Sequence, residues 1–123
     1  TLLRPLVDAG VDVIHASNRR FWEPEFEGSN LNLAGWTKKI TGLPTITVGS
    51  VGLESDFIGF YQGEDEVKSA PIDDLVKRMD DKEFDMVAVG RALLSDPEWV
   101  NKVKEGRYDE VIPFSKKHAE NYY

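Results

Sequence analysis

The fold of this chain is decided by residues 86–99, Met86-Val87-Ala88-Val89-Gly90-Arg91-Ala92-Leu93-Leu94-Ser95-Asp96-Pro97-Glu98-Trp99. The apolar start of this stretch predicts a strand buried on both faces that ends at a functional rim. Gly90 lets an anion approach the backbone amides, and Arg91 adds a planar fork of donors that suits phosphate or carboxylate. A helix is predicted next, with Ser95 as its N-cap, Pro97 in its first turn and Glu98 completing a capping box.

Composition limits the classes of protein to which the chain can belong. The 123 residues, 41% hydrophobic and 30% charged, are typical of one globular domain or part of one. A net charge of −7 argues against nucleic acid as a partner, and the absence of cysteine excludes disulfides and thiolate chemistry. Without a long apolar run or a signal-peptide pattern, we expect a cytoplasmic protein that does not bind membranes. Because the chain starts at Thr1, we expect a segment of a longer protein.

Helices and strands alternate along the chain. Three stretches with apolar residues at helical spacing are each followed by a glycine, which is expected to end the helix; these glycines are Gly10, Gly42 and Gly106. One helical face is predicted to carry the apolar side chains of Ile72, Leu75, Val76 and Met79. The predicted strands are 10–17, 43–50 and 84–89, the predicted helices are 1–9, 33–40, 72–79 and 96–105, and the predicted loops are 18–32 and 51–70.

This alternation predicts an α/β fold with parallel strands. An open doubly wound sheet usually carries a G-x-G-x-x-G fingerprint, which is missing here. A (β/α)8 barrel binds phosphate after its last two strands, where this chain has Gly49-Ser50 and Gly90-Arg91. A whole barrel needs about 250 residues, so residues 1–123 are predicted to be a single partial barrel segment, about strands 6–8, with a C-terminal tail at 108–123.

Four segments also carry a family resemblance, namely residues 10–17, 19–24, 44–52 and 89–97. The last of them, V-G-R-x-L-L-x-D-P, is the most specific. Together they resemble the last third of the old yellow enzyme family, which comprises flavin-dependent NADH:flavin oxidoreductases and ene-reductases. The resemblance implies that FMN is bound and that NAD(P)H is the reductant. It also implies a small-molecule substrate with an activated double bond.

Site residues follow from the same resemblance. It implies that Gly49 and Ser50 hold the FMN phosphate, that Gly90 and Arg91 close on it, and that the substrate pocket is lined by Arg20, Phe21 and Trp22. The family's catalytic residues lie on strands that have no counterpart here. No catalytic residue is therefore assigned, and the isolated chain is expected to be inactive. No metal ligand is assigned either, because the acidic residues lack a compact spacing with histidine and are expected in solvated loops; they are Glu23, Glu25, Glu27, Glu64, Asp65 and Glu66.

Several alternatives stay open on the sequence alone. Arg91 could pair with a carboxylate, Gly49 could merely end a strand, and Phe21 with Trp22 could cover the end of a barrel. His15 is expected to be a hydrogen-bonded core or rim residue, and His118 to be exposed. Two other functions remain possible. One is a barrel isomerase or lyase for a phosphorylated metabolite, and the other is a non-catalytic half-barrel that forms a homo-oligomer or associates with a missing half.

Overall fold

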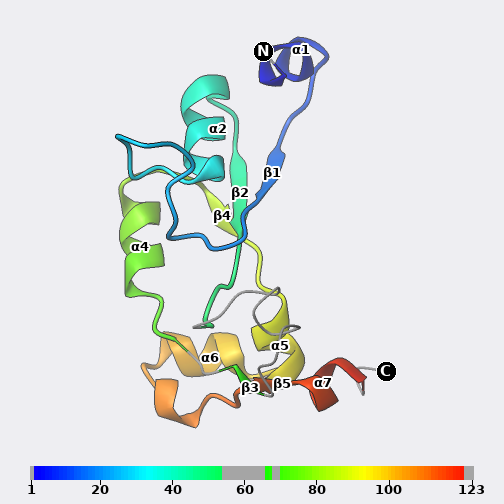
Figure 1. Ribbon diagram of the computed structural model, residues 1–123, viewed down its shortest axis with the longest axis vertical. Coiled ribbons are helices and arrows are strands. Elements are labelled where there is room, and N and C mark those ends of the chain that lie inside the picture. The colour runs from blue at the N-terminus through cyan, green and yellow to red at the C-terminus, as the bar shows by residue number, and fades with distance from the viewer. Residues whose placement is uncertain (1, 54–65, 68–69, 121–123) are drawn as a thin grey trace. The chain divides into compact units, whose positions relative to one another are not determined.

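The computed structural model describes residues 2–53, 66–67 and 70–120 (Figure 1). The chain divides into two compact units, of which the first comprises residues 1–49 and 73–88 and the second residues 50–72 and 89–123. Most of the loop predicted at 51–70, including Glu64 and Asp65, lies outside the described residues. Within the described ranges, no helix is both long and apolar enough to cross a membrane.

The first unit is built on a parallel three-stranded sheet (Figure 1). Its strands are β1 (Ile14–Ser17), β2 (Thr45–Val48) and β4 (Met86–Val87), in the order β1-β2-β4. Helix α1 (Leu3–Asp8) precedes β1, α2 (Leu33–Thr41) connects β1 to β2, and α4 (Asp73–Asp80) precedes β4. These elements confirm the predicted α/β alternation with parallel pairing, although each strand is shorter than predicted.

The sheet has one buried face and one open face. Ala16, Thr45 and Thr47 are buried on the side where α2 packs along β1 and β2. On the other face, His15 is exposed and is in register with Ile46, which in turn pairs with Met86, 40% exposed. The prediction that the third strand is buried on both faces is therefore wrong, because within the described residues helices cover one face alone. His15, predicted to be a core or rim residue, is not in the core, because it is exposed on the open face; its place at a rim stays a prediction.

Two helices of the first unit end in the same backbone motif with different residues. After α1, Gly10 has φ +94°, and the amides of Gly10 and Val11 donate to the carbonyls of Val7 and Leu6 at 3.0 and 3.3 Å. This is a Schellman cap, with glycine in the left-handed position as the sequence predicted. After α4, Lys82 occupies the equivalent position at φ +60°. A residue with a Cβ is strained there.

Helix α4 buries less of its apolar face than predicted. Leu75 is 3% exposed and belongs to the core, while Ile72 and Met79 are half-buried. Val76, however, is 45% exposed, so its placement on the buried face was wrong. The helix packs through a narrower stripe than its apolar pattern suggests.

The second unit consists of short elements. They are α5 (Arg91–Ser95), α6 (Trp99–Lys104), the 3-10 helix η1 (Tyr108–Glu110), α7 (Lys116–Glu120), and the antiparallel pair β3 (Glu66–Val67) and β5 (Phe114–Ser115). Their core contains Val51, Leu53, Ala92, Trp99, Val111 and Phe114, each no more than 7% exposed. The β3–β5 pair was not predicted.

The capping box predicted around Ser95 is wrong. Ser95 is the buried last residue of α5, and its hydroxyl lies 3.0 Å from the carbonyl oxygen of Ile112 and 3.1 Å from that of Ala92, to either of which it can donate. Asp96 instead accepts a hydrogen bond from the Glu98 amide at 3.0 Å, and α6 begins one residue later, at Trp99. The Ser95 hydroxyl, predicted from the local sequence to cap the next helix, therefore lies against the distant carbonyl of Ile112 instead.

Candidate functional site

Ser50 and Arg91, predicted to share an anion, lie together in the second unit. The Nη2 atom of Arg91 donates to Ser50 Oγ at 3.4 Å, although the residues are 41 positions apart. Ser50 has φ +52°, a left-handed conformation that is strained for a residue other than glycine, and its carbonyl accepts from the Leu53 amide at 3.1 Å. A strained turn thus presents a hydroxyl to a guanidinium.

The guanidinium of Arg91 also packs on an aromatic ring. Its Cζ atom lies 5.8 Å from the ring centroid of Phe114, which belongs to β5 and is 2% exposed. A cation over an aromatic face is attracted by the ring quadrupole, so Phe114 restricts where the half-buried Arg91 can point. Sequence reasoning missed Phe114 because nothing local links residues 91 and 114.

Gly49 and Gly90, the two glycines of the predicted phosphate site, have different surroundings. In the first unit, Gly49 has φ +150°, and a Cβ there would lie 2.6 Å from the Asn18 carbonyl oxygen. Close backbone packing therefore explains Gly49 on structural grounds. In the second unit, Gly90 is exposed and a Cβ would meet nothing within 4 Å. Packing does not require glycine at position 90, and the predicted approach of an anion there remains a prediction.

The three predicted pocket residues belong to the first unit and differ in exposure. Phe21 is 5% exposed and forms part of the core. Trp22 is half-buried, with its ring edge-on to that of Phe21 at a centroid distance of 5.1 Å. Arg20 forms an ion pair with Glu23 at 2.5 Å. Of the two rings, Trp22 is therefore the one with surface to offer to another molecule.

Two asparagines that sequence reasoning missed hold the loop between β1 and α2. Asn32, 1% exposed, caps α2 by accepting from the Gly35 amide at 2.8 Å, and its Nδ2 donates to the Phe21 carbonyl at 2.9 Å. Asn18 Nδ2 lies 3.0 Å from Thr47 Oγ1, and its Oδ1 accepts from the Leu33 amide at 3.0 Å. An asparagine directly before an apolar helical run is an N-cap signal, so Asn32 could have been found from sequence.

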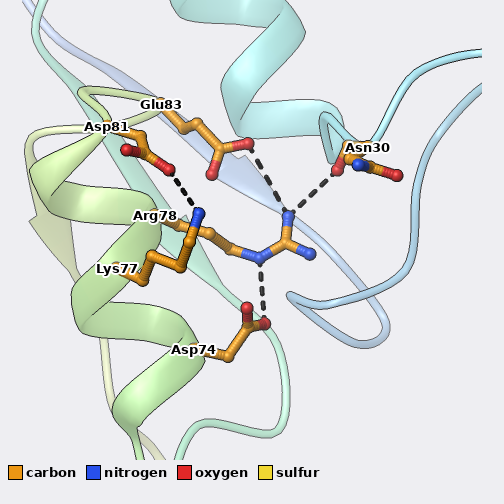
Figure 2. Close-up of a pocket in the computed structure, with 6 residues that line it drawn as sticks. All are labelled: Asn30, Asp74, Lys77, Arg78, Asp81 and Glu83. Atoms are coloured by element: carbon orange, nitrogen blue, oxygen red, sulfur yellow. Dashed lines mark hydrogen bonds and ion pairs between the residues drawn. The ribbon is translucent and has the colours of Figure 1, made fainter.

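Arg78 forms the centre of a second polar cluster in the first unit (Figure 2). Its Nε donates to Asp74 at 2.9 Å, and its Nη1 and Nη2 donate to the carbonyls of Asn30 and Trp22 at 3.0 and 3.3 Å. Glu83 lies 3.7 Å from Nη1. Burial raises the pKa of Glu83, and the attraction of Arg78 only partly offsets this. The cluster lines a hollow of about 260 Å³ together with Lys77 and Asp81, which pair at 2.9 Å.

One buried carboxylate joins several parts of the second unit. Asp96 is 1% exposed and accepts from Lys102 Nζ at 2.7 Å and from the Ile112 amide at 3.0 Å, in addition to the Glu98 amide. Burial alone would raise the pKa of Asp96. The hydrogen bonds from Lys102 and the two amides outweigh it and lower the pKa below its ordinary value. Asp96 is therefore held as an anion.

His118 also differs from its prediction as an exposed residue. It is half-buried, and its Nδ1 accepts a hydrogen bond from the Ser115 amide at 3.0 Å. The Ser115 hydroxyl oxygen also lies 3.0 Å from Nδ1. The bond from the Ser115 amide is one half of a capping box at the start of α7, with histidine in the position usually held by glutamate. Within the part of the chain that the structure describes, no group of three or more His, Cys, Asp or Glu is placed to hold a metal ion.

Fold and site together define an α/β protein with a parallel sheet and a serine–arginine pair. No protein-family model matches the chain. The chain is similar to an NADH oxidase of Thermoanaerobacter brockii, with 35% identity over 118 residues. This match covers 89% of the chain and 15% of the relative, so the chain spans only about a seventh of the length of that NADH oxidase.

Proposed function

We propose that this chain forms the FMN-phosphate end of an NAD(P)H-dependent flavin oxidoreductase of the old yellow enzyme type. The contact between Ser50 and Arg91, in two segments that carry the family resemblance, is the observation on which the proposal rests. The similarity to an NADH oxidase over most of the chain supports the same class of reaction.

The residues present fit a phosphate group. Arg91 supplies a permanent positive charge and several donors, and Ser50 supplies a hydroxyl 3.4 Å from the nearest guanidinium nitrogen. Two donors at this spacing can bond two oxygens of one phosphate. Gly90, next to Arg91, adds no side chain that would obstruct the approach. Gly49 would contribute its backbone to the same group.

The proposed architecture is a (β/α)8 barrel, of which the sheet forms about strands 6–8. Two observations support it: the three strands are parallel, and their order in the sheet follows their order in the chain. A barrel would also cover the open face that carries His15 and Met86, because that face would become the barrel interior.

FMN would supply hydride transfer when bound, and the chain's own residues would bind and orient it. Ser50 and Arg91 would fix the phosphate. Trp22, with Arg20 and Phe21, would form a wall of the pocket for a small substrate with an activated double bond. We assign no catalytic residue to this chain, so turnover would require the other parts of a complete barrel.

Replacing Arg91 tests the phosphate assignment. A charge-assisted hydrogen bond contributes about 1.5–3 kcal/mol, so Arg91→Ala should weaken FMN binding by roughly 10- to 150-fold. Flavin fluorescence titration measures this in protein expressed from its complete reading frame. The matched control is Arg107→Ala, which removes an arginine of the same unit that pairs with Glu105 and Glu110. An FMN dissociation constant unchanged in Arg91→Ala would refute the assignment.

We also propose that the open sheet face is covered by other strands, from the same polypeptide or from a second copy. Val13 and Met86 are 44% and 40% exposed, and β1 and β4 are the outer strands of the sheet. Such surface favours association. Light scattering on the 123-residue chain should therefore give a mass above that of a monomer, and a stable monomer at high concentration would count against this proposal.

A further inference from the structure

The backbone of the proposed pocket wall is held at two consecutive carbonyls. The Phe21 carbonyl accepts from Asn32 Nδ2 at 2.9 Å, and the Trp22 carbonyl accepts from Arg78 Nη2 at 3.3 Å. Asn32 has a second role as the N-cap of α2. Arg78, in contrast, belongs to α4 and is 56 residues beyond Trp22. The local structure of the loop does not account for a bond to so distant a residue.

The guanidinium of Arg78 closes a loop. Its Nη1 donates to the Asn30 carbonyl at 3.0 Å while Nη2 reaches Trp22, so one group bonds both ends of the segment 22–30, which we call the wall loop. Asp74 fixes the direction of the fork by accepting from Nε at 2.9 Å. Figure 2 shows the guanidinium directed at Asn30, with Asp74 on one side and Glu83 on the other.

The geometry depends on arginine rather than on positive charge alone. Three nitrogens of one planar group donate in three directions, which a lysine ammonium on its flexible stem cannot reproduce. The Arg78 side chain is only 13% exposed, so its bonds are largely shielded from water. The neighbouring hollow does not need a ligand to balance its charges, since Arg78 lies against Asp74 and Glu83, and Lys77 pairs with Asp81.

We propose that Arg78 is the positioning residue of the wall loop and sets the direction in which Trp22 faces the substrate. The statement about the substrate rests on the proposed function; the statement about the loop does not. The hydrogen bonds from Arg78 to the loop go to the backbone carbonyls of Trp22 and Asn30, so we assign it a positioning role and no catalytic one.

The test compares Arg78→Lys with Lys77→Ala, which alters the adjacent residue and breaks only an exposed ion pair. Protein labelled with 5-fluorotryptophan gives a 19F signal for each tryptophan, and Trp22→Phe assigns the signal of interest. We expect Arg78→Lys to move the Trp22 signal, to leave the Trp99 signal in place, and to speed cleavage by a glutamate-specific protease about tenfold. The cleavage sites, read by mass spectrometry, are Glu25 and Glu27, since the bond after Glu23 leads into Pro24 and is not cleaved. A Trp22 signal and cleavage rate equal to those of Lys77→Ala would overturn the proposal.

A milder variant keeps the proposal testable if Arg78→Lys does not fold, which loss of the native signal of Trp36, in α2 of the same unit, would reveal. Asp74→Asn removes the carboxylate charge that orients Nε of Arg78. The Asp74 side chain is 54% exposed, so its replacement disturbs the packing little. It should shift the Trp22 signal in the same direction and speed cleavage about threefold. No shift and no acceleration in Asp74→Asn would overturn the proposal.

A kinetic measurement distinguishes the role of Arg78 in holding the wall loop from the role of Trp22 in facing the substrate. In the FMN-loaded protein expressed from its complete reading frame, Arg78→Lys should raise KM for the substrate with the activated double bond about tenfold while the FMN dissociation constant stays at the wild-type value. An unchanged KM in a variant whose wall loop has opened would overturn the role of Trp22 in the substrate wall. If wild-type protein neither binds FMN nor oxidises NADH, the proposed function fails, while the 19F and cleavage results still decide the role of Arg78.

Discussion

The two units of this chain hold their irregular segments in different ways. In the first unit, Asn18, Asn32 and Arg78 share the task, each donating to backbone carbonyls of the loop after β1 or of the neighbouring β2. In the second unit, the single carboxylate of Asp96 accepts from the amides of Glu98 and Ile112 and from Lys102. A loop held by several side chains should keep its conformation when one of them is removed. Several segments held by one carboxylate should all be weakened when that carboxylate is removed. Substitutions should therefore cost more in the second unit.

Asp96→Asn is the largest expected effect. It leaves the Lys102 ammonium, 16% exposed, without its carboxylate partner and weakens two backbone hydrogen bonds. Breaking a buried ion pair costs about 3–5 kcal/mol, and we expect about 3 kcal/mol because the ammonium also donates to the Glu110 carbonyl. Urea unfolding measures the loss. Asp109→Asn, at an exposed carboxylate of the same unit, is the control and should change stability little.

Acid titration sharpens this prediction. Because folding lowers the pKa of Asp96, its contribution is present above the pKa of an unfolded aspartate and is lost as pH falls through the folded pKa. The stability difference between wild type and Asp96→Asn should therefore shrink as the solution is acidified through that window. A difference that stays constant down to the lowest pH at which the protein folds would contradict the anionic role of Asp96.

Asn32→Ala is the largest effect expected in the first unit, at about 2 kcal/mol. The variant loses the α2 cap and leaves the Phe21 carbonyl without its donor, while Asn18 and Arg78 continue to hold the loop. Asn32→Asp separates the two losses, since aspartate keeps the cap but cannot donate. Thermal unfolding should rank the wild type above both variants. If Asn32→Ala loses more unfolding free energy than Asp96→Asn, the contrast between a loop held by several side chains and segments held by one carboxylate is wrong.

Lys82→Gly is the smallest effect and has the opposite sign. Removing the Cβ at φ +60° relieves about 1–2 kcal/mol of strain, and glycine's greater freedom in the unfolded chain returns about 0.5–1 kcal/mol. We expect a net gain of about 0.5–1 kcal/mol by chemical denaturation. Lys82→Ala keeps the Cβ and should bring no gain, so equal stabilities for the two variants would rule out relief of strain as the cause.

Sequence was sufficient where local signals agree. The apolar spacing of 33–40 and the glycine at position 42 predict α2 almost to the residue. The alternation of such helices with short apolar runs predicts the parallel sheet. Gly10 and Gly106 both have the positive φ expected of residues that close helices.

Sequence failed where a distant partner decides the outcome. The Ser95 hydroxyl lies within hydrogen-bond distance of the carbonyl oxygen of Ile112, 17 residues away, instead of capping α6. The Ser50–Arg91 contact lies between the two cases, since both the barrel layout and the family resemblance predicted one site for the two residues, although no local signal links positions 50 and 91. Arg78 gave no signal at all, because its partners at 22 and 30 are backbone carbonyls, which any residue carries.

The central claim, that Ser50 and Arg91 hold a phosphate, is tested most directly by comparing FMN with riboflavin, which lacks the phosphate. Both are titrated by flavin fluorescence into the protein expressed from its complete reading frame and into its Arg91→Ala variant. We predict that wild-type protein binds FMN roughly 10- to 150-fold more tightly than riboflavin, and that Arg91→Ala removes most of this preference while leaving riboflavin affinity unchanged. Equal affinity of the wild-type protein for FMN and riboflavin would contradict the claim.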